Sequence, residues 1–202
     1  MAFEVDTSKD LGGEGTGLKE NGNYHMFVTA MFEDTSIKGK PLKGGGFSAL
    51  LTVLAGSTEG QEEKTFGLTL FNVDFTQKES AQEWARRKQT AALIAMNVLP
   101  LDKLGSGKVA VDLAAGQGHQ LIINLKNEEY EGETNLRLQY ANVYHVDDPR
   151  VADLAKFPRN VDALKRIEAP YRKPVEYFAA IATPVAPATG SGKISTDAMS
   201  KL

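Results

Sequence analysis

Apolar and polar residues alternate with a period of two through most of the middle of the chain. In residues 64–71, for example, phenylalanine and leucine alternate with threonine and glycine, which is the pattern of a strand with one buried face. Residues 24–32 and 47–54 carry apolar side chains on both faces, so we expect them near the centre of a sheet. In residues 134–144 the alternation loses its phase near Ala141, which indicates a bulge. The predicted strands are residues 24–32, 47–54, 64–71, 119–126 and 134–144, with residues 108–113 as a shorter sixth candidate.

One segment breaks this rhythm and has a helical period instead. In residues 78–99, alanines, Trp84 and other apolar residues recur at spacings of three, four and seven, and Pro100 ends the pattern. The order of elements is therefore three strands, one long helix, and two or three further strands. This order predicts a mainly β fold: an OB-fold-like, partly closed antiparallel barrel with the helix inserted between its strands. A helix-covered sandwich is the alternative.

The two ends of the chain differ from the middle in composition. Residues 1–22 contain five glycines and few large apolar side chains, and residues 169–202 contain four prolines. Glycine loses the most backbone entropy on ordering, and proline interrupts helices and strands. We therefore predict a flexible N-terminal arm at 1–22, one folded domain at 23–168 and a flexible C-terminal tail at 169–202. The tail residues that could dock on a partner are Tyr171, Tyr177, Phe178 and Ile181.

Composition narrows the class of protein. The chain has 202 residues, of which 42% are hydrophobic and 24% charged, which is typical of a globular protein. There is no cysteine, and this excludes disulfides, thiolate zinc sites and a cysteine nucleophile. No apolar run reaches the roughly 18 residues of a membrane span, and no signal-peptide core is present, so we expect a cytoplasmic protein. The net charge of −3 means that any binding to a polyanion depends on a local basic patch.

Motifs for catalysis are weak. Two Gly-Ser-Gly-Lys sequences, at residues 105–108 and 190–193, lack both the earlier glycine and the following hydroxyl of a phosphate-binding loop. A metal-dependent nuclease that uses His145, Asp147 and Asp148 is the least favoured hypothesis. Asp148 before a proline is better explained as the N-cap of a helix over residues 149–156, and another short helix is expected at 161–168. We predict no catalytic residue, no metal and no cofactor.

Binding of an unpaired nucleic acid requires cations for the phosphates and exposed rings on which bases stack. The basic residues predicted to contact phosphates lie in loops or beside aromatic residues: Lys38, Lys40, Lys43, Lys126 and Arg137. The rings predicted to stack on bases are Phe47, Tyr130 and Tyr144. Tyr140 is in phase with Leu136 and Leu138, so we expect it in the core. The basic run at residues 86–88 has a competing explanation, which is pairing with Glu79 and Glu83.

Several short sequences together resemble a known family. They are Gly-Asn-Tyr at residues 22–24, KTFGLTLFN at 64–72, Gly-Lys-Val at 107–109 and EYEGETN at 129–135. Over residues 22–148 the chain resembles phage-encoded single-stranded DNA-binding proteins. The resemblance implies an OB-fold barrel without catalysis, which binds single-stranded DNA during phage replication or recombination in the host cytoplasm. It also implies self-association, and replication or recombination proteins as partners of the C-terminal tail. The alternative is a phage structural or assembly protein with a β-rich fold and docking tails.

Overall fold

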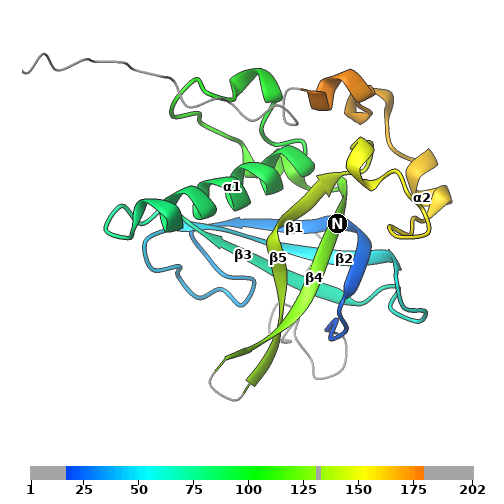
Figure 1. The fold of residues 1–202 in the computed structure, drawn as a ribbon, viewed down its shortest axis with the longest axis horizontal. Coiled ribbons are helices and arrows are strands. Elements are labelled where there is room, and N and C mark those ends of the chain that lie inside the picture. Colours follow the sequence, from blue (N-terminus) through cyan, green and yellow to red (C-terminus); the bar gives the residue numbers. More distant parts are fainter. Residues whose placement is uncertain (1–16, 131–132, 180–202) are drawn as a thin grey trace, which may run out of the picture.

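The alternating segments form one antiparallel sheet of five strands in the computed structural model, which describes residues 17–130 and 133–179 (Figure 1). The strand order is β3-β2-β1-β4-β5, so β3 and β5 are the two edges and the sheet is not closed. The protein is therefore mainly β, with a few helices. The strands are β1 Gly22–Glu33, β2 Gly46–Gly56, β3 Thr65–Phe71, β4 Gln120–Tyr130 and β5 Glu133–His145.

The core lies on one face of this sheet, against the C-terminal end of helix α1 (Glu79–Ala95). The alternation in β3 is confirmed, because Phe66, Leu68 and Leu70 are buried while the residues between them are half-exposed. β1 and β2 lie inside the sheet, as their two-sided apolar pattern predicted. The sixth predicted strand is not formed. Residues 108–112 have no regular structure, and Asp112 caps the 3-10 helix η2 (Leu113–Gly116) by accepting a hydrogen bond from the Ala114 N–H at 3.0 Å.

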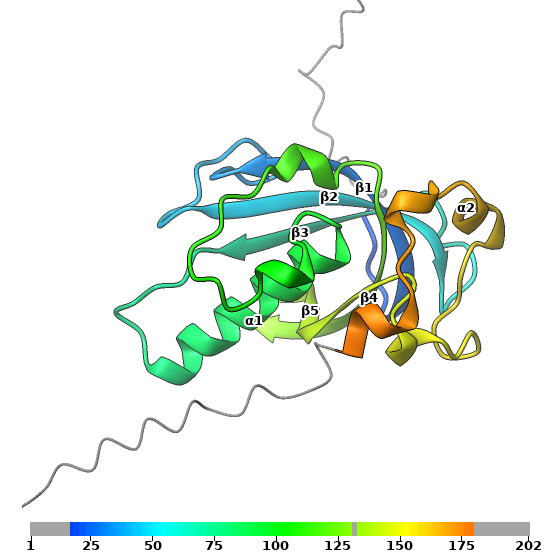
Figure 2. The ribbon, with the colours of Figure 1, turned by 90° about the horizontal axis from the view of Figure 1, so that it is seen from above.

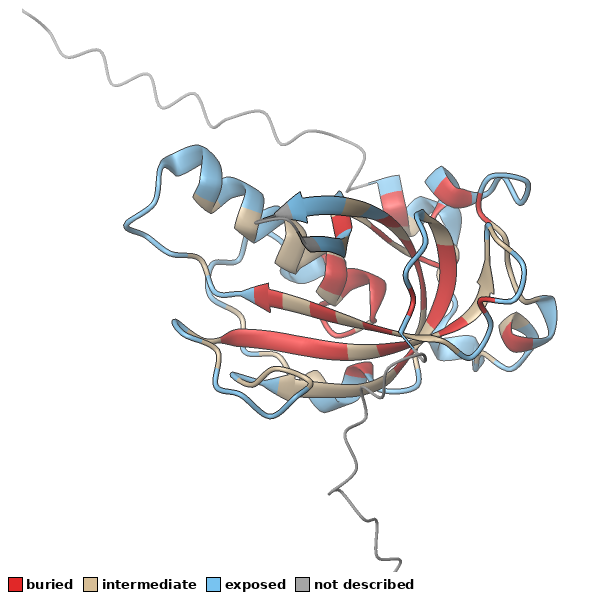
Figure 3. Cartoon of the chain, turned by 90° about the horizontal axis from the view of Figure 1, so that it is seen from below, coloured by how far each residue is buried: buried red, intermediate tan, exposed pale blue. Residues whose placement is uncertain are grey.

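Helix α1 is shorter and less buried than its sequence pattern predicts. It ends at Ala95, and Asn97 then takes a positive φ of 57°, which a helix does not tolerate. Within the helix only Ala92, Ile94 and Ala95 are buried. The N-terminal turns project past the sheet and are exposed on most sides (Figure 3). Trp84, which the pattern placed on the core face, is 45% exposed.

The segment after β5 packs against the sheet instead of forming a tail from residue 169. It contains 3-10 helix η3 (Pro149–Val151), α2 (Val161–Lys165), η4 (Ala169–Tyr171) and η5 (Val175–Phe178). Phe178 is only 3% exposed, and its ring centroid lies 5.6 Å from that of His145. The predicted boundary at 169 thus falls inside a packed segment, and residues 180–202 of that tail lie outside the described residues. Figure 2 shows this segment at the end of the molecule opposite the N-terminus of α1.

The other predicted boundaries also differ from those in the structure. Leu18, inside the predicted arm, is 6% exposed, and its N–H donates to the Thr65 carbonyl at 2.9 Å. The arm prediction for residues 1–16 lies outside the described part of the chain. The predicted cap at Asp148 is confirmed, because its carboxylate accepts the Arg150 N–H at 2.9 Å, but the helix that follows is a single 3-10 turn. Residues 152–156 are exposed and supply no apolar face that would extend it.

Candidate nucleic-acid interface

Three of the predicted cations lie in the loop between β1 and β2. Lys38, Lys40 and Lys43 are exposed, and within the described residues none of them forms an ion pair. The loop itself is held by hydrogen bonds: the Asp34 carboxylate accepts the Gly46 N–H at 2.8 Å, and the Ser36 N–H donates to the Lys40 carbonyl at 2.8 Å. An ordered loop therefore presents three lysines that form no ion pair within the described residues, although Glu33 and Asp34 stand at its start.

Lys126 and Arg137 are paired directly across the β4–β5 hairpin, and both are exposed. Residues directly opposite in an antiparallel pair lie on the same face, where two like charges destabilise the sheet unless an anion lies between them. The contact of Arg137 with Glu128 is long, at 3.9 Å, and solvent-exposed, so it contributes little. The third residue predicted for this hairpin is Tyr130; the position of its side chain lies outside the described part of the structure.

Two predicted stacking rings are not freely exposed. Phe47 is 5% exposed and belongs to the core, because it is the first inward-facing residue of β2, opposite Leu70. Phe47 is therefore corrected from a stacking residue to a core residue. Tyr144 is half-buried: the Arg150 guanidinium lies 4.9 Å from its ring centroid, and the ring meets Phe157 edge-on at 6.3 Å. Burial also raises the pKa of Tyr144, as expected of a ring packed into a second apolar cluster.

The structure exposes a different set of rings around the N-terminal half of α1. We call this set the aromatic–arginine surface. It consists of Phe71, Phe75, Trp84, Tyr140, Arg86 and Arg87. The four rings are between 45% and 73% exposed, which is unusual for side chains of this size. Each guanidinium lies 5.7 Å from a ring centroid, Arg86 over Phe75 and Arg87 over Trp84.

Helix α1 brings these residues together because it contacts both edge strands. On the β3 side, the Gln89 amide donates to the Phe71 carbonyl at 2.7 Å, and the Gln82 amide donates to the Phe75 carbonyl at 3.3 Å. On the β5 side, the Trp84 ring lies 6.0 Å from Tyr140, centroid to centroid. The helix thus brings its own tryptophan and arginines next to aromatic residues at both open edges of the sheet.

Tyr140 is exposed because β5 contains a large bulge. Four residues of β5, 139–142, lie opposite the single residue Asn124 of β4. Tyr140 takes a φ of 53° in this bulge, a left-handed conformation that costs a non-glycine residue about 1–3 kcal/mol. The bulge breaks the phase of the strand, so the core position predicted for Tyr140 is wrong and its ring is 61% exposed.

Sequence reasoning missed Trp84 as well, although a signal was present. Between residues 79 and 90 the only apolar residues are two alanines and Trp84, so this stretch lacks the apolar neighbours that would bury an indole ring. The basic run at 86–88 was recognised, and its competing explanation holds in part because Arg87 pairs with Glu83. Both of those side chains are more than half exposed, so the pairing is weak.

The polar cluster after β5 is structural. The Asp147 carboxylate accepts hydrogen bonds from the Arg172 guanidinium at 2.6–3.0 Å, and Asp148 forms an ion pair with Arg150 at 2.6 Å. Burial alone would raise the pKa of Asp147, but the Arg172 and Lys173 hydrogen bonds bring it below its usual value. Across the described ranges, no group of three or more His, Asp or Glu side chains is arranged to hold a metal ion.

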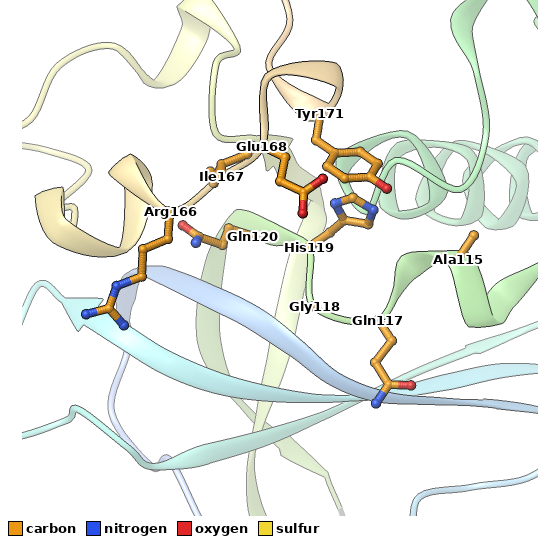
Figure 4. A pocket seen from close by; sticks show the side chains of 9 residues that line it. All are labelled: Ala115, Gln117, Gly118, His119, Gln120, Arg166, Ile167, Glu168 and Tyr171. Atoms are coloured by element: carbon orange, nitrogen blue, oxygen red, sulfur yellow. The ribbon is translucent and has the colours of Figure 1, made fainter.

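A cavity of about 260 Å³ lies between η2, the start of β4 and the segment that follows α2 (Figure 4). Its lining is mostly polar and includes His119, Gln120, Arg166, Glu168 and Tyr171. None of the predicted site residues lines it, and it carries one cation against one carboxylate. This cavity therefore does not extend the basic and aromatic surfaces described above.

Searches against models of known protein families and against curated proteins find no match to this chain. Within the ranges that the structure describes, no helix has both the length and the apolar character needed to cross a membrane. The geometry of the exposed rings and cations is therefore the main basis for a functional proposal.

Proposed function

We propose that this protein binds single-stranded DNA without sequence preference and without catalysis. The observation that carries the proposal is the aromatic–arginine surface, where four exposed rings are interleaved with two arginines. Rings with a free face stack on any base, each stack contributing about 1–3 kcal/mol, and arginines bind the phosphates between the bases. Duplex DNA hides its bases from such rings, so the surface suits an unpaired strand.

Cations next to these rings support the same proposal. The loop between β1 and β2 that carries Lys38, Lys40 and Lys43, which we call the lysine loop, joins the surface directly. The Asn72 N–H, next to Phe71, donates to the Gly45 carbonyl of this loop at 3.0 Å. Lys126 and Arg137 add a second pair of charges on the β4–β5 hairpin. An acidic chain can bind a polyanion only if its positive charges are gathered locally. The lysine loop meets this condition with its three lysines, whereas four glutamates accompany Lys126 and Arg137 on the hairpin.

The arrangement of elements supports an OB-fold-like architecture as part of the proposal. A three-stranded meander, a helix between β3 and β4, and pairing of β1 with both β2 and β4 are all expected for such a fold. OB-folds bind oligonucleotides with strands 2 and 3 and with the loops that follow strands 1 and 4. The lysine loop follows β1, and Lys126 and Arg137 flank the turn that follows β4.

The sequence resemblance to phage single-stranded DNA-binding proteins adds a biological setting. In this setting the protein coats strands exposed during phage replication or recombination in the cytoplasm of the host. Partners would be other copies of the chain and the replication or recombination proteins that act on the same strand. A structural or assembly role in the phage particle is the alternative, in which the exposed rings would contact protein.

A fluorescence anisotropy titration of a labelled single-stranded oligonucleotide tests the proposal. We expect binding at low salt, weaker binding to the matching duplex, and an affinity that falls steeply as salt increases. A triple alanine variant of the lysine loop should lower the salt slope by about 2, because each phosphate contact to a single strand contributes about 0.7. The loop variant is K38A/K40A/K43A. Its charge-matched control is K103A/K108A/K156A, which removes three lysines from other parts of the chain.

Absence of binding at low salt, or equal affinity for duplex, would refute the proposal. Stable self-association by light scattering, with no affinity for any oligonucleotide, would favour the assembly role instead. An equal loss of salt dependence in the loop variant and in the charge-matched control would show that the lysine loop has no special part in binding.

A further inference from the structure

We propose that Trp84 and Tyr140 form a clamp that holds one nucleobase of a bound strand between their two rings. This inference rests on the proposed function and assigns it a defined binding position. The rings come from different elements, α1 and the bulge of β5, and lie next to each other with centroids 6.0 Å apart and planes inclined by 37°. Both are exposed, Trp84 by 45% and Tyr140 by 61%.

The separation of the rings is close to what a base requires. Stacked bases are about 3.4 Å apart, so a base between two parallel rings needs a centroid separation of about 6.8 Å. The present distance of 6.0 Å would have to increase by about 0.8 Å, with the planes turning toward parallel. The single ring–ring contact is then replaced by two ring–base contacts.

Both rings lie on parts of the chain that allow this small opening. Residues 79–87 of α1 are exposed or half-exposed throughout, so the turn that carries Trp84 has few packing contacts to lose. Tyr140 lies in the bulge, outside the regular pairing of β4 and β5, with its backbone in the left-handed region. The strained backbone turns the ring toward α1 rather than into the sheet, as expected at a binding position.

The chemistry around the clamp favours nucleic acid over a protein partner. Every large apolar side chain exposed on this surface is aromatic, whereas the exposed aliphatic ones, such as Leu104, Leu154 and Val175, lie elsewhere in the chain. Aromatic residues and arginine are also enriched at protein–protein interfaces, so the feature that favours a base is the pair of exposed rings at close to stacking distance. Arg87 lies over the Trp84 ring and Arg86 lies over the Phe75 ring, so a cation is available next to the held base and another beside a neighbouring ring.

The chain offers a direct probe, because Trp84 is its only tryptophan. Unlabelled oligodeoxythymidine, longer than the roughly 4–16 nucleotides bound by one OB-type domain, is titrated into the full chain while tryptophan emission is recorded. We expect quenching that saturates at the same oligonucleotide concentration as the anisotropy signal. Binding by phosphate contacts alone would leave the emission unchanged.

Variants separate stacking from other roles of the rings. Y140A and Y140L should each weaken binding by about 5- to 150-fold, the equivalent of one lost base stack, and Y140F should bind like the original chain. W84F should retain most of the affinity, whereas W84A should lose as much as Y140A. Far-ultraviolet circular dichroism checks that each variant is folded, and Y140L keeps apolar bulk so that only the flat ring is removed.

The outcomes for the clamp and for the proposed function are distinguishable. Binding without quenching, together with unchanged affinity in Y140A and Y140L, would overturn the clamp and leave single-strand binding in place. No binding by the original chain would overturn both. Emission from Trp84 that changes with protein concentration in the absence of oligonucleotide would identify the surface as a contact between copies of the chain, and would also overturn the clamp.

Discussion

Acid should destabilise this protein well above the pH at which carboxylates titrate, because two buried histidines must stay neutral. His25 and His145 are 0% and 2% exposed, and each accepts a backbone N–H at Nδ1, from Asn160 and from Asp147, at 3.1 Å. Protonation of Nδ1 would turn each of these contacts into two facing N–H groups. Burial is the main reason that the pKa of each ring is lowered to about 4, only partly offset by the Gln120 hydrogen bond at His25 and by Asp147 at His145.

The size of the effect follows from proton linkage. A histidine whose pKa falls from 6.5 in the unfolded chain to about 4 in the fold contributes stability that is complete above pH 6.5 and is lost as the pH falls toward 4. Each ring thus accounts for a loss of about 3 kcal/mol across this range. Near pH 5 the unfolded chain binds about two more protons than the folded one, so the free energy of unfolding should rise by about 2.7 kcal/mol per pH unit. The lowered pKa of Asp147 acts at lower pH, below its usual value of 3.8.

Urea unfolding at a series of pH values between 7 and 4.5 measures this slope. H25N keeps an acceptor for the Asn160 N–H but cannot titrate, so it should remove about half of the slope while lowering stability at pH 7. A variant of the half-exposed His119, such as H119N, is the matched control and should change the slope less, because its pKa is lowered by weaker burial. A free energy of unfolding that stays constant from pH 6.5 to 4.5, or a slope that H25N leaves intact, would refute the reasoning.

Two further predictions concern the C-terminal segment and the bulge. Phe178→Ala should lower the free energy of unfolding by about 3 kcal/mol, because Phe178 is 3% exposed. Val175→Ala, at an exposed position of the same segment, should change it by less than about 0.5 kcal/mol. Equal effects of the two substitutions in urea unfolding would contradict the packing of this segment. Tyr140→Gly should be about 1 kcal/mol more stable than Tyr140→Ala, because glycine adopts a φ of 53° without strain. Both Tyr140 variants should bind oligonucleotide equally weakly, and a difference in affinity between them would indicate that the backbone, not the ring, matters.

Alternation predicted the five strands well because each of them buries at least one side of the chain against a common core. β3 is the clearest example, with Phe66, Leu68 and Leu70 inward and small residues outward. The predicted sixth strand failed because two inward-facing residues, Val111 and Leu113, also fit a turn that touches the core. The extra length predicted for α1 has a similar cause. Met96 and Leu99 are buried as their spacing suggested, but they lie in a turn rather than in a helix.

The candidate site was harder to predict because exposure of a ring depends on register. A shift of one residue exchanges the two faces of a strand, so the sequence alone does not separate Phe47, which is buried, from Tyr140, which is exposed. The basic residues needed no register, because loops and hairpin ends are exposed whichever face is inward. Lys38, Lys40, Lys43, Lys126 and Arg137 are accordingly all exposed.

The packed C-terminal segment escaped prediction because its contacts join distant residues. The Asn160 N–H reaches His25, which is 135 positions earlier, and Arg172 reaches Asp147 across 25 positions. Prolines and short apolar stretches give this segment the composition of a tail, and only the partners that it finds on the sheet make it part of the fold. Local patterns do not contain that information.

The position of α1 links the open sheet to the exposed rings. An antiparallel barrel closes when its two edge strands pair, and here the edges are β3 and β5. Helix α1 contacts both of them, and the Phe71 carbonyl at the end of β3 accepts its hydrogen bond from Gln89 of the helix. Only the C-terminal end of α1 packs on the apolar core. The N-terminal turns of the helix extend past the sheet. The rings of Phe71, at the end of β3, and Tyr140, in the bulge of β5, are then left facing solvent beside the helix. The same placement that keeps the sheet from closing thus creates the surface on which we place the bound strand.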